Sequence, residues 1–488
     1  MNRRQFLTVS GIAATSVVLG ACAPAREIVK RSRGDDVGFI LPPLVADEIW
    51  RALSRMTYAP RSDEIARANE IGRDAWIEEQ LAPETIDDLD CELRTRGLDT
   101  LWMDPDLILN VRQDAVKQEL QQAAVLRAIY SRRQLYETMV EFWGDHFNIA
   151  QDKLDCAWLK TVDDREVIRK HALGNFHDLL WASMHSPAML HYLDNQENFK
   201  DAPNENYARE LLELHSLDVD AGYTQRDVRE TARCLTGWTV NQKWRRGRFE
   251  FDAGQHDDAE KIVLGVTIPP SGGEADGQKV FDAISAHPAL PRFIARKLVR
   301  RFVADHPPAS LVEKTARVFS ETRGEIKAML RVILFSPEFQ NASPKYKRPL
   351  HLVAGALRQL NVETNVSALL LDQLARMGQP LFQWAMPDGF PDRASAWQNN
   401  LLSRWQFAIV LASDEIQGAR VEWNELQNIA GDGSMRDALR NFSALLLGDG
   451  LPKTNIEMLA EKLRDVPQEF VAQTAVAVLL ASPQYQWR

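Results

Sequence analysis

Apolar residues recur at helical spacing through almost the whole chain after about Leu44. They return every three or four positions among Ala, Leu, Glu, Arg and Gln, which are strong helix formers. The segments with this pattern are 63–81, 110–130, 132–149, 164–190, 204–218, 225–237, 276–303, 310–336, 347–360, 366–377, 396–416, 435–447 and 455–482. The sequence therefore predicts a mainly α fold, a large multi-helix, bundle-like module without an internal repeat.

Strand-like alternation is confined to about residues 238–270. There the runs WTV, RFEF and IVLG are bounded by glycines, which predicts a small β insert within the helical module. Residues 378–397 form one long irregular stretch that is rich in Pro and aromatic residues. We expect this stretch to be an ordered loop packed on the helices, because such side chains bury well.

The first 22 residues resemble an export signal. The run RRQFL at residues 3–7 matches the twin-arginine pattern, and a short, weakly apolar segment follows it. The run LGAC that ends at Cys22 resembles a bacterial lipobox, in which the cysteine is lipidated. An ordinary signal peptide that happens to carry a cysteine is the alternative. The twin-arginine route carries proteins that are already folded. One reason to fold before export is to bind a cofactor in the cytoplasm, but the signal does not identify a cofactor.

These features predict an order of segments and a location. A signal peptide covers 1–21, a tether covers 22–43, and a single mainly helical module covers 44–488. We expect a periplasmic or cell-surface protein, anchored to the membrane through lipid on Cys22. The outer membrane is favoured where the cell has one, because residue 23 is Ala and not the Asp of the inner-membrane retention signal.

Composition narrows the classes of partner. The formal net charge is −10 at pH 7, whereas a nucleic-acid-binding protein shows a basic face, so we expect no nucleic-acid partner. Past the signal there is no run of about 18 apolar residues, so no further membrane span is predicted. Cys91, Cys156 and Cys234 lack metal-ligand spacing. Three buried unpaired thiols are the favoured interpretation, and one disulfide is the alternative.

Two carboxylates stand one helical turn apart in the run NENYARELLELH, residues 204–215. At 100° per residue, Arg209, Glu210 and Glu213 share one sector of the helix, and Tyr207 lies on the opposite face. Paired carboxylates are suited to holding a cation or transferring a proton. A solvated stripe with Glu–Arg pairs at i,i+4 spacing is the alternative.

A second candidate helix, residues 136–148, places His146 at the border of its apolar stripe, with Glu137 and Glu141 on the polar side. His146 is either a hydrogen-bonded core histidine or a metal ligand or general base that faces Glu210. Eight of the ten histidines lie between residues 146 and 287, which favours a site in this part of the chain. The pair His256-Asp257 lies in the β insert, from which we expect it to close over the helices.

Several runs together resemble a bacterial family, the domain of unknown function 1800. They are EFWGDHFN, HALGNFHDLL, SPAMLHYLDN, NENYARELLELHSL, YTQRDVRETARCLTGW, FEFDAGQHD and LFQWAMPDGFPD, in the family's order across about residues 44–485. The resemblance implies one mainly helical module of undetermined biochemistry. The positions that it singles out are His146, Asn204, Glu205, Arg209, Glu210, Glu213 and His215. Two positions depart from the pattern: Asp218 stands where Gly is usual, and Ser216 where Thr is usual.

Two functions follow as hypotheses. The first is an exported hydrolase, metal-assisted if a divalent metal is bound, with catalytic His146, Arg209, Glu210 and Glu213. Its predicted metal ligands are His146, Glu210, Glu213, His256 and Asp257. The second is a non-catalytic lipoprotein that binds another exported protein or a surface polymer. A haem or flavin carrier is disfavoured, because the chain has no Cys-x-x-Cys-His run and no Gly-rich dinucleotide motif.

Overall fold

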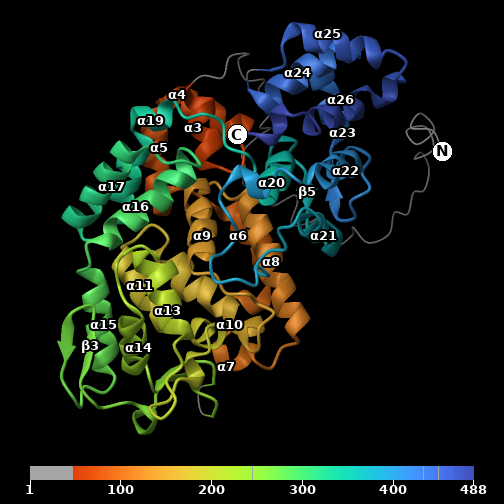
Figure 1. Ribbon diagram of the computed structural model, residues 1–488. Coiled ribbons are helices and arrows are strands. Elements are labelled where there is room, and N and C mark those ends of the chain that lie inside the picture. The colour runs from red at the N-terminus through yellow and green to blue at the C-terminus, as the bar shows by residue number, and fades with distance from the viewer. Residues whose placement is uncertain (1–47, 244–245, 432, 449) are drawn as a thin grey trace.

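The protein is mainly α-helical (Figure 1). The computed structural model describes residues 48–243, 246–431, 433–448 and 450–488. The signal peptide, Cys22 and the tether predicted for 1–43 therefore lie outside the described residues. No helix in the described ranges combines the length and the apolar composition needed to cross a bilayer.

The helices of the first half follow one another closely. They are α3 (Glu48–Met56), α4 (Ser62–Ile71), α5 (Arg73–Leu81), α6 (Leu89–Thr95), α7 (Pro105–Ile108), α8 (Gln113–Tyr130), α9 (Gln134–His146), α10 (Cys156–Asp163), α11 (Phe176–Met184), α12 (Pro187–Tyr192), α13 (Asn206–Leu212) and α14 (Gln225–Cys234). Two stretches are π-helical, η3 (Asp164–Arg169) and η5 (Glu213–Leu217). The second of these continues α13 without a break.

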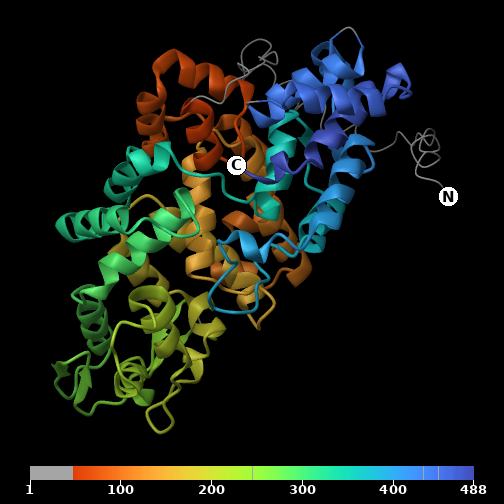
Figure 2. The same ribbon diagram turned by 45° about the horizontal axis from the view of Figure 1, so that its top comes forward.

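The second half is also helical and returns to the first. Its helices are α15 (Ala275–Ser285), α16 (Ala289–Phe302), α17 (Ala309–Thr322), α18 (Ile326–Leu334), α19 (Pro337–Gln340), α20 (Pro349–Gln359), α21 (Ala368–Arg376), α22 (Leu401–Ala412), α23 (Trp423–Ala430), α24 (Met435–Leu447), α25 (Lys453–Lys462) and α26 (Val471–Leu480). Figures 1 and 2 show α20 beside α8, and the C-terminus near α3.

The β insert lies where the alternation predicts it. Two antiparallel hairpins pair β1 (Trp238–Val240) with β2 (Phe249–Phe251), and β3 (Lys261–Val263) with β4 (Val266–Ile268). In the first hairpin Trp238 is opposite Phe251. A third pair joins β5 (Glu363–Thr364) to β6 (Ala419–Arg420). Periodicity does not predict this last pair, because two-residue strands are too short to show alternation.

Two large hydrophobic cores hold the helices together. One runs from α3 through α9 and α13 to α18, and the other joins α8 and α20 to α24 and α26. The three cysteines 91, 156 and 234 are buried and unpaired, as the favoured interpretation expects. The loop over 378–397 is ordered and runs across the middle of the molecule beside α9 (Figures 1 and 2).

Candidate functional site

The helix that carries Glu210 and Glu213 has the predicted two faces. Tyr207 and Leu211 are buried, whereas Glu210 and Glu213 are half-buried. Glu213 begins the π-helix η5, which turns the last residues of the segment away from a regular α-helical course. Single π turns inside α-helices occur frequently at functional sites. The sequence pattern located this helix but gave no sign of its π-helical end.

Arg209 lies on the outer side of this helix and makes surface contacts. Its guanidinium donates to Glu205 at 3.2 Å and to Gln225 at 3.0 Å. The Glu205–Arg209 contact is the i,i+4 pair that the solvated-stripe alternative predicts. Arg209 therefore has partners outside the cavity described next.

His146 is a buried side chain at the end of α9. Its Nε2 donates to the backbone oxygen of His215 at 3.0 Å, and this bond leaves Nδ1 as an unpaired acceptor among the described residues. Its ring packs on Phe147, with centroids 4.4 Å apart, and lies near Phe293. Burial lowers the pKa of His146 well below its ordinary value, with Lys297 as a second cause. His146 is thus a neutral core histidine.

His146 also lines a cavity of about 420 Å³, which we call the α9–α16 cavity. Parts of five segments surround it: the end of α9, the segment that begins with η5, helix α16, Arg348 just before α20, and the loop residues 388–393. The charged residues of its lining are Asp145, Glu213, Asp218, Asp220, Arg296, Lys297, Arg300, Arg301, Arg348, Asp388, Asp392 and Arg393. His146 and Glu213, predicted from separate helices, therefore meet at one cavity.

The loop that closes one side of this cavity is fixed to α9. Asn148 Nδ2 donates to the backbone oxygens of Trp384 and Met386, at 2.9 and 2.8 Å. Gly389 has φ +71°, and a Cβ atom there would collide with the backbone oxygen of Asp145. A glycine therefore permits the close approach of loop and helix.

Ion pairs around the cavity join these segments. Arg301 contacts Glu141 at 2.5 Å, and Arg348 contacts Asp145 at 2.6 Å. At the rim, Arg296 contacts Asp218 at 2.7 Å. The polar side of α9 therefore faces buried arginines and not solvent.

Several guanidinium nitrogens near the cavity have no partner among the described residues. Arg300 Nε, Arg301 Nε and Nη1, and Arg348 Nε and Nη2 are buried without a hydrogen-bond partner among the described residues. A buried donor that lacks a partner is costly, by about 1–3 kcal/mol and more for a charged group. Donors of this kind around one cavity suit an anionic group, because carboxylates and phosphates accept from guanidinium in a paired geometry.

Lys297 and Glu210 have pKa values moved toward neutrality. Burial lowers the pKa of Lys297 to about 8, with Arg300 acting in the same direction and Asp145, Asp388 and Asp218 opposing it. Burial also raises the pKa of Glu210, and Glu213 adds to this effect. Lys297 Nζ forms no hydrogen bond or ion pair with a described residue and lies 5.3 Å from the Phe293 ring centroid.

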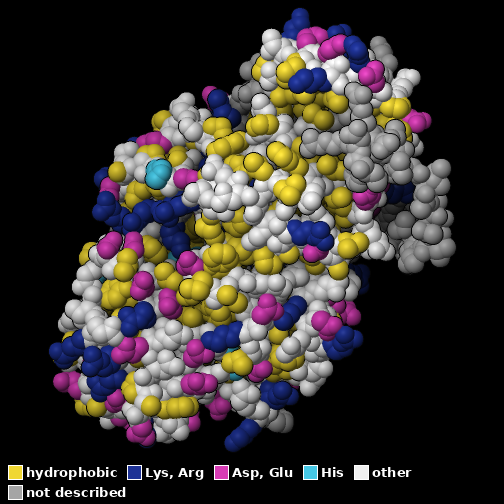
Figure 3. All heavy atoms as spheres, turned by 45° about the vertical axis from the view of Figure 1, so that its right-hand side comes forward, with side chains coloured by type: hydrophobic (Ala, Val, Ile, Leu, Met, Phe, Trp, Pro, Cys, Tyr) yellow, Lys and Arg dark blue, Asp and Glu magenta, His cyan; other side chains and the backbone are white. Residues whose placement is uncertain are grey.

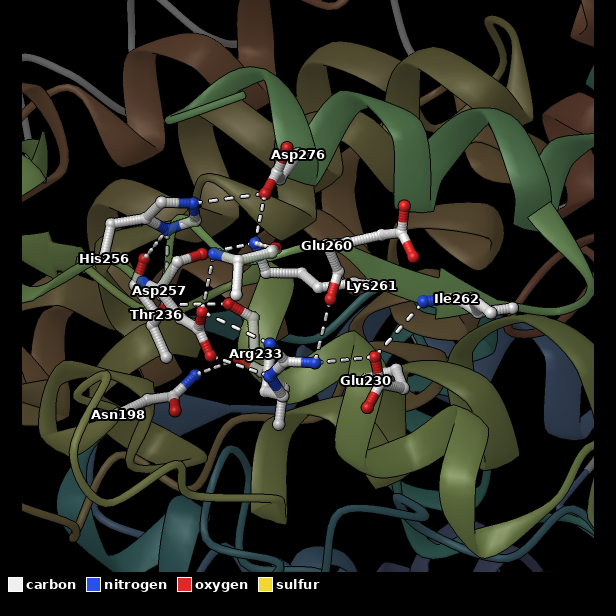
Figure 4. Close-up of polar contacts among 12 residues, drawn as sticks. Asn198, Glu230, Arg233, Thr236, His256, Asp257, Glu260, Lys261, Ile262 and Asp276 are labelled. Atoms are coloured by element: carbon white, nitrogen blue, oxygen red, sulfur yellow. Dashed lines mark hydrogen bonds and ion pairs between the residues drawn. The ribbon is translucent and has the colours of Figure 1, made fainter. Parts of the chain in front are cut away.

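His256 and Asp257 lie in a different place, in the β insert (Figure 4). His256 contacts the Thr236 backbone oxygen through Nδ1 at 2.8 Å and Asp276 through Nε2 at 3.2 Å. Asp257 accepts from Arg233 at 2.7 Å. The expectation that this pair closes over the Glu210 helix is therefore wrong, because Arg233 and Thr236 at the end of α14 and Asp276 on α15 hold it against those two helices.

The metal set predicted from the sequence needs the same correction. In the described part of the chain, no group of three or more His, Cys, Asp and Glu residues is placed to hold a metal ion. His146 and Glu213 share a cavity, but His256 and Asp257 are bound elsewhere, and Glu210 lies outside the lining. The residues present therefore do not fit the proposed divalent metal.

Sequence reasoning missed the cationic half of the cavity. Arg296, Lys297, Arg300 and Arg301 come from one run on α16, RKLVRR, and Arg348 precedes α20. This run could have predicted a cationic helix face, because cations at i, i+1, i+4 and i+5 occupy one side of a helix. Asp388 and Asp392 belong to the irregular stretch, where periodicity gives no orientation.

Comparisons with known proteins give a family and nothing closer. A search of curated proteins and a search of solved structures found no match. Residues 51–487 match the model of the family described as protein of unknown function (DUF1800). The match spans most of the chain, and the protein therefore belongs to this family.

Proposed function

We propose that the α9–α16 cavity binds the acidic group of a substrate and catalyses hydrolysis by general acid–base chemistry. The observation that carries the proposal is the meeting of unpaired arginine donors with Lys297 and Glu213 around one cavity of about 420 Å³. This volume falls in the range of small-molecule sites. The proposal keeps the hydrolytic chemistry expected from the sequence and routes no step through a metal.

The arginines supply binding in this proposal. Arg300, Arg301 and Arg348 keep unpaired N–H groups beside the cavity, and an incoming carboxylate or phosphate would accept from them. Asp145 and Glu141 already hold two of these arginines in place. The acidic group of a substrate would therefore bind to guanidinium groups whose orientation is fixed beforehand.

Lys297 and Glu213 supply proton transfer. A lysine whose pKa is about 8 holds useful amounts of both protonation states near neutral pH, which suits a general acid or base. Glu213 provides a carboxylate in the lining of the same cavity. His146 stays neutral and oriented by the His215 oxygen, so its Nδ1 can accept a hydrogen bond.

Chromogenic esters test this function. We expect the purified protein to hydrolyse mono-p-nitrophenyl succinate, which carries a free carboxylate, at least about tenfold more efficiently than the neutral p-nitrophenyl acetate. Lys297→Met should lower kcat by about 100-fold or more, because it removes the proton-transfer group. Arg300→Gln should raise KM for the acidic ester and leave the neutral ester unchanged.

Arg292→Gln is the matched control, since Arg292 is an exposed residue of the same helix whose contact is with Glu313. It should behave as the unmodified protein. Equal rates on both esters, or full activity of Lys297→Met, would contradict the proposal.

We further propose that the protein is exported and lipid-anchored, as the N-terminal runs predict. Support comes from the RRQFL and LGAC runs ahead of the described body. Palmitate labelling of cells that express the full chain should mark the protein, and Cys22→Ser should abolish the label. Labelling that persists in this variant would contradict anchoring through Cys22, whereas retention of the Arg3→Lys/Arg4→Lys variant in the cytoplasm would support twin-arginine export.

One surface feature favours a second candidate, a binding or assembly role. Helix α22 exposes Leu401, Leu402, Trp405 and Ile409, with Leu402 67% exposed. Figure 3, which brings this side of the molecule forward, shows hydrophobic side chains gathered over a broad area. Exposed apolar patches mark interaction sites. A photo-crosslinker at position 405, compared with one at 436 on α24, should give a discrete adduct in intact cells if the role is assembly.

A further inference from the structure

A second cavity, of about 730 Å³, lies where α3 meets the C-terminal part of the chain. We call it the α3–α24 cavity. Its walls come from α3, residues 339–347, α24 and the last residues of the chain. Figure 1 shows these segments together near the point marked C. The cavity shares no lining residue with the α9–α16 cavity, so its function is a separate question.

The charged side chains that line this cavity have one sign. Four cationic residues line it, Arg51, Arg55, Lys347 and Arg488, and no Asp or Glu is among the described lining residues. This excess is unexpected in a chain whose net charge is −10. Cations gathered in a concave, partly dry site concentrate a positive potential there.

Two of the cations are deeply buried and form no ion pair with a described residue, although Asp392 and Asp305 lie near enough to Arg55 to act on its pKa. Arg55 is 4% exposed and Lys347 is 5% exposed. Arg55 Nη2 donates to the backbone oxygen of Ser343, while Nη1 has no partner among the described residues. Lys347 Nζ forms no hydrogen bond or ion pair with a described residue and lies 3.4 Å from the ring centroid of Tyr485.

Arg488 adds a third cation beside them. Its Nη1 donates to the backbone oxygen of Arg55 at 3.5 Å, and its Nε has no partner among the described residues. Burial lowers the pKa of Arg488 to about 9 and that of Arg55 to about 10, and it lowers the pKa of Lys347 well below its ordinary value. Buried cations without partners are expensive, and an anion would offset that cost.

Most of the rest of the wall is apolar, and its uncharged polar residues are Ser54, Gln359 and Gln484. The large apolar residues of the lining are Trp50, Tyr58, Phe339, Leu446, Leu447 and Trp487. Such a wall adds nothing to the binding of an inorganic anion, but it would bury a hydrocarbon chain. A cationic end beside an apolar wall matches a molecule with an acidic head and an apolar tail.

We propose that the α3–α24 cavity binds an anionic amphiphile, with its carboxylate or phosphate head against Arg55, Lys347 and Arg488 and its hydrocarbon tail along the apolar wall. A free fatty acid and a single-chain lipid phosphate have this chemistry in common. The proposal is independent of the hydrolytic function, because it uses none of the residues of the α9–α16 cavity.

Calorimetric titration of the full chain with defined probes tests the inference. Dodecanoate and dodecyl phosphate provide the two heads, dodecanol provides the tail alone, and inorganic phosphate provides the head alone. We expect at least one charged amphiphile to bind about tenfold or more tightly than both dodecanol and inorganic phosphate. The preferred head distinguishes a fatty acid from a lipid phosphate.

Three variants locate the binding. Lys347→Met should weaken binding of the charged amphiphile by about tenfold and leave dodecanol unchanged. Ala342 is a half-exposed lining residue, and Ala342→Trp should weaken the binding of the charged amphiphile and of dodecanol alike, because the larger side chain fills the cavity. Lys453→Gln removes an exposed cation of α25 and should change nothing. Circular dichroism checks that each variant is folded, and the comparison of probes on the unmodified chain holds even where a variant unfolds.

Three results would overturn the proposal. Dodecanol that binds as tightly as dodecanoate and dodecyl phosphate would remove the role of the cations. Inorganic phosphate that binds as tightly as dodecyl phosphate would make this a free-anion site. An apolar hexapeptide with a free carboxyl end that binds about tenfold more tightly than dodecanoate would assign the cavity to a polypeptide terminus.

Discussion

Asp218 has a backbone conformation that suits glycine. Its φ is +84° and its ψ is 150°, a region in which a Cβ atom is strained by about 1–3 kcal/mol. The carboxylate offsets part of this cost, because it contacts Arg296 at 2.7 Å and accepts from the Val219 amide at 2.8 Å. We predict that Asp218→Gly raises the free energy of unfolding by about 0.5–1 kcal/mol, measured by urea denaturation.

Asp218→Ala is the control for this prediction. It loses the same two contacts but keeps the Cβ atom, so we expect it to destabilise the protein by up to about 1 kcal/mol. An alanine variant as stable as the glycine variant would show that the backbone at 218 is not strained. The sequence comparison had already singled out residue 218, because the family pattern has Gly there. The structure shows that the helix end keeps a backbone conformation typical of glycine although the residue is Asp.

At the scale of elements, the loop over 378–397 depends on one glycine. Because a Cβ at Gly389 would collide with the Asp145 backbone, Gly389→Ala must displace the loop from α9. We predict faster amide hydrogen exchange over 384–393 and a loss of about 1–3 kcal/mol in stability. Gly144→Ala is the control: it lies within α9, where a Cβ meets nothing within 4 Å, so it should stabilise by about 0.5–1 kcal/mol. Unchanged exchange in Gly389→Ala would contradict the close contact.

Periodicity predicted most helices but joined several that are separate. The pattern over 276–303 continues through Pro288, yet the structure has α15 and α16 on either side of it. The pattern over 310–336 likewise passes Gly324, whose φ is +86°, between α17 and α18. Apolar spacing persists across such breaks because both helices face the same core. Pro and Gly were the local signals that could have placed these boundaries.

At the scale of the whole molecule, the sequence predicted only part of the candidate site. His146 and Glu213 were found because their helices have a polar residue beside an apolar stripe. Their arginine neighbours were not found, because Glu141 on a helix face has the same pattern whether it meets solvent or the buried Arg301. Only the packing of α16 against η5 and the position of Arg348 decide between these outcomes.

Buried neutral histidines should make the whole molecule sensitive to acid. Burial lowers the pKa of His215 from 6.5 to about 3, and it lowers those of His146 and His351 as well. Between pH 6.5 and 3 the unfolded chain holds the His215 proton and the folded chain does not. Stability must therefore fall as the pH falls, by about 1.4 kcal/mol per pH unit for this residue.

The variant His215→Phe isolates this effect, because every other titrating group remains. Phenylalanine fits a position whose ring lies 5.2 Å from that of Phe147, and the backbone oxygen that accepts from His146 is unchanged. Urea denaturation between pH 6 and 4 should give the variant a flatter decline, with the difference in slope close to about 1.4 kcal/mol per pH unit. Parallel curves would mean that His215 takes up its proton in the folded protein, which requires water to reach the interior behind α9.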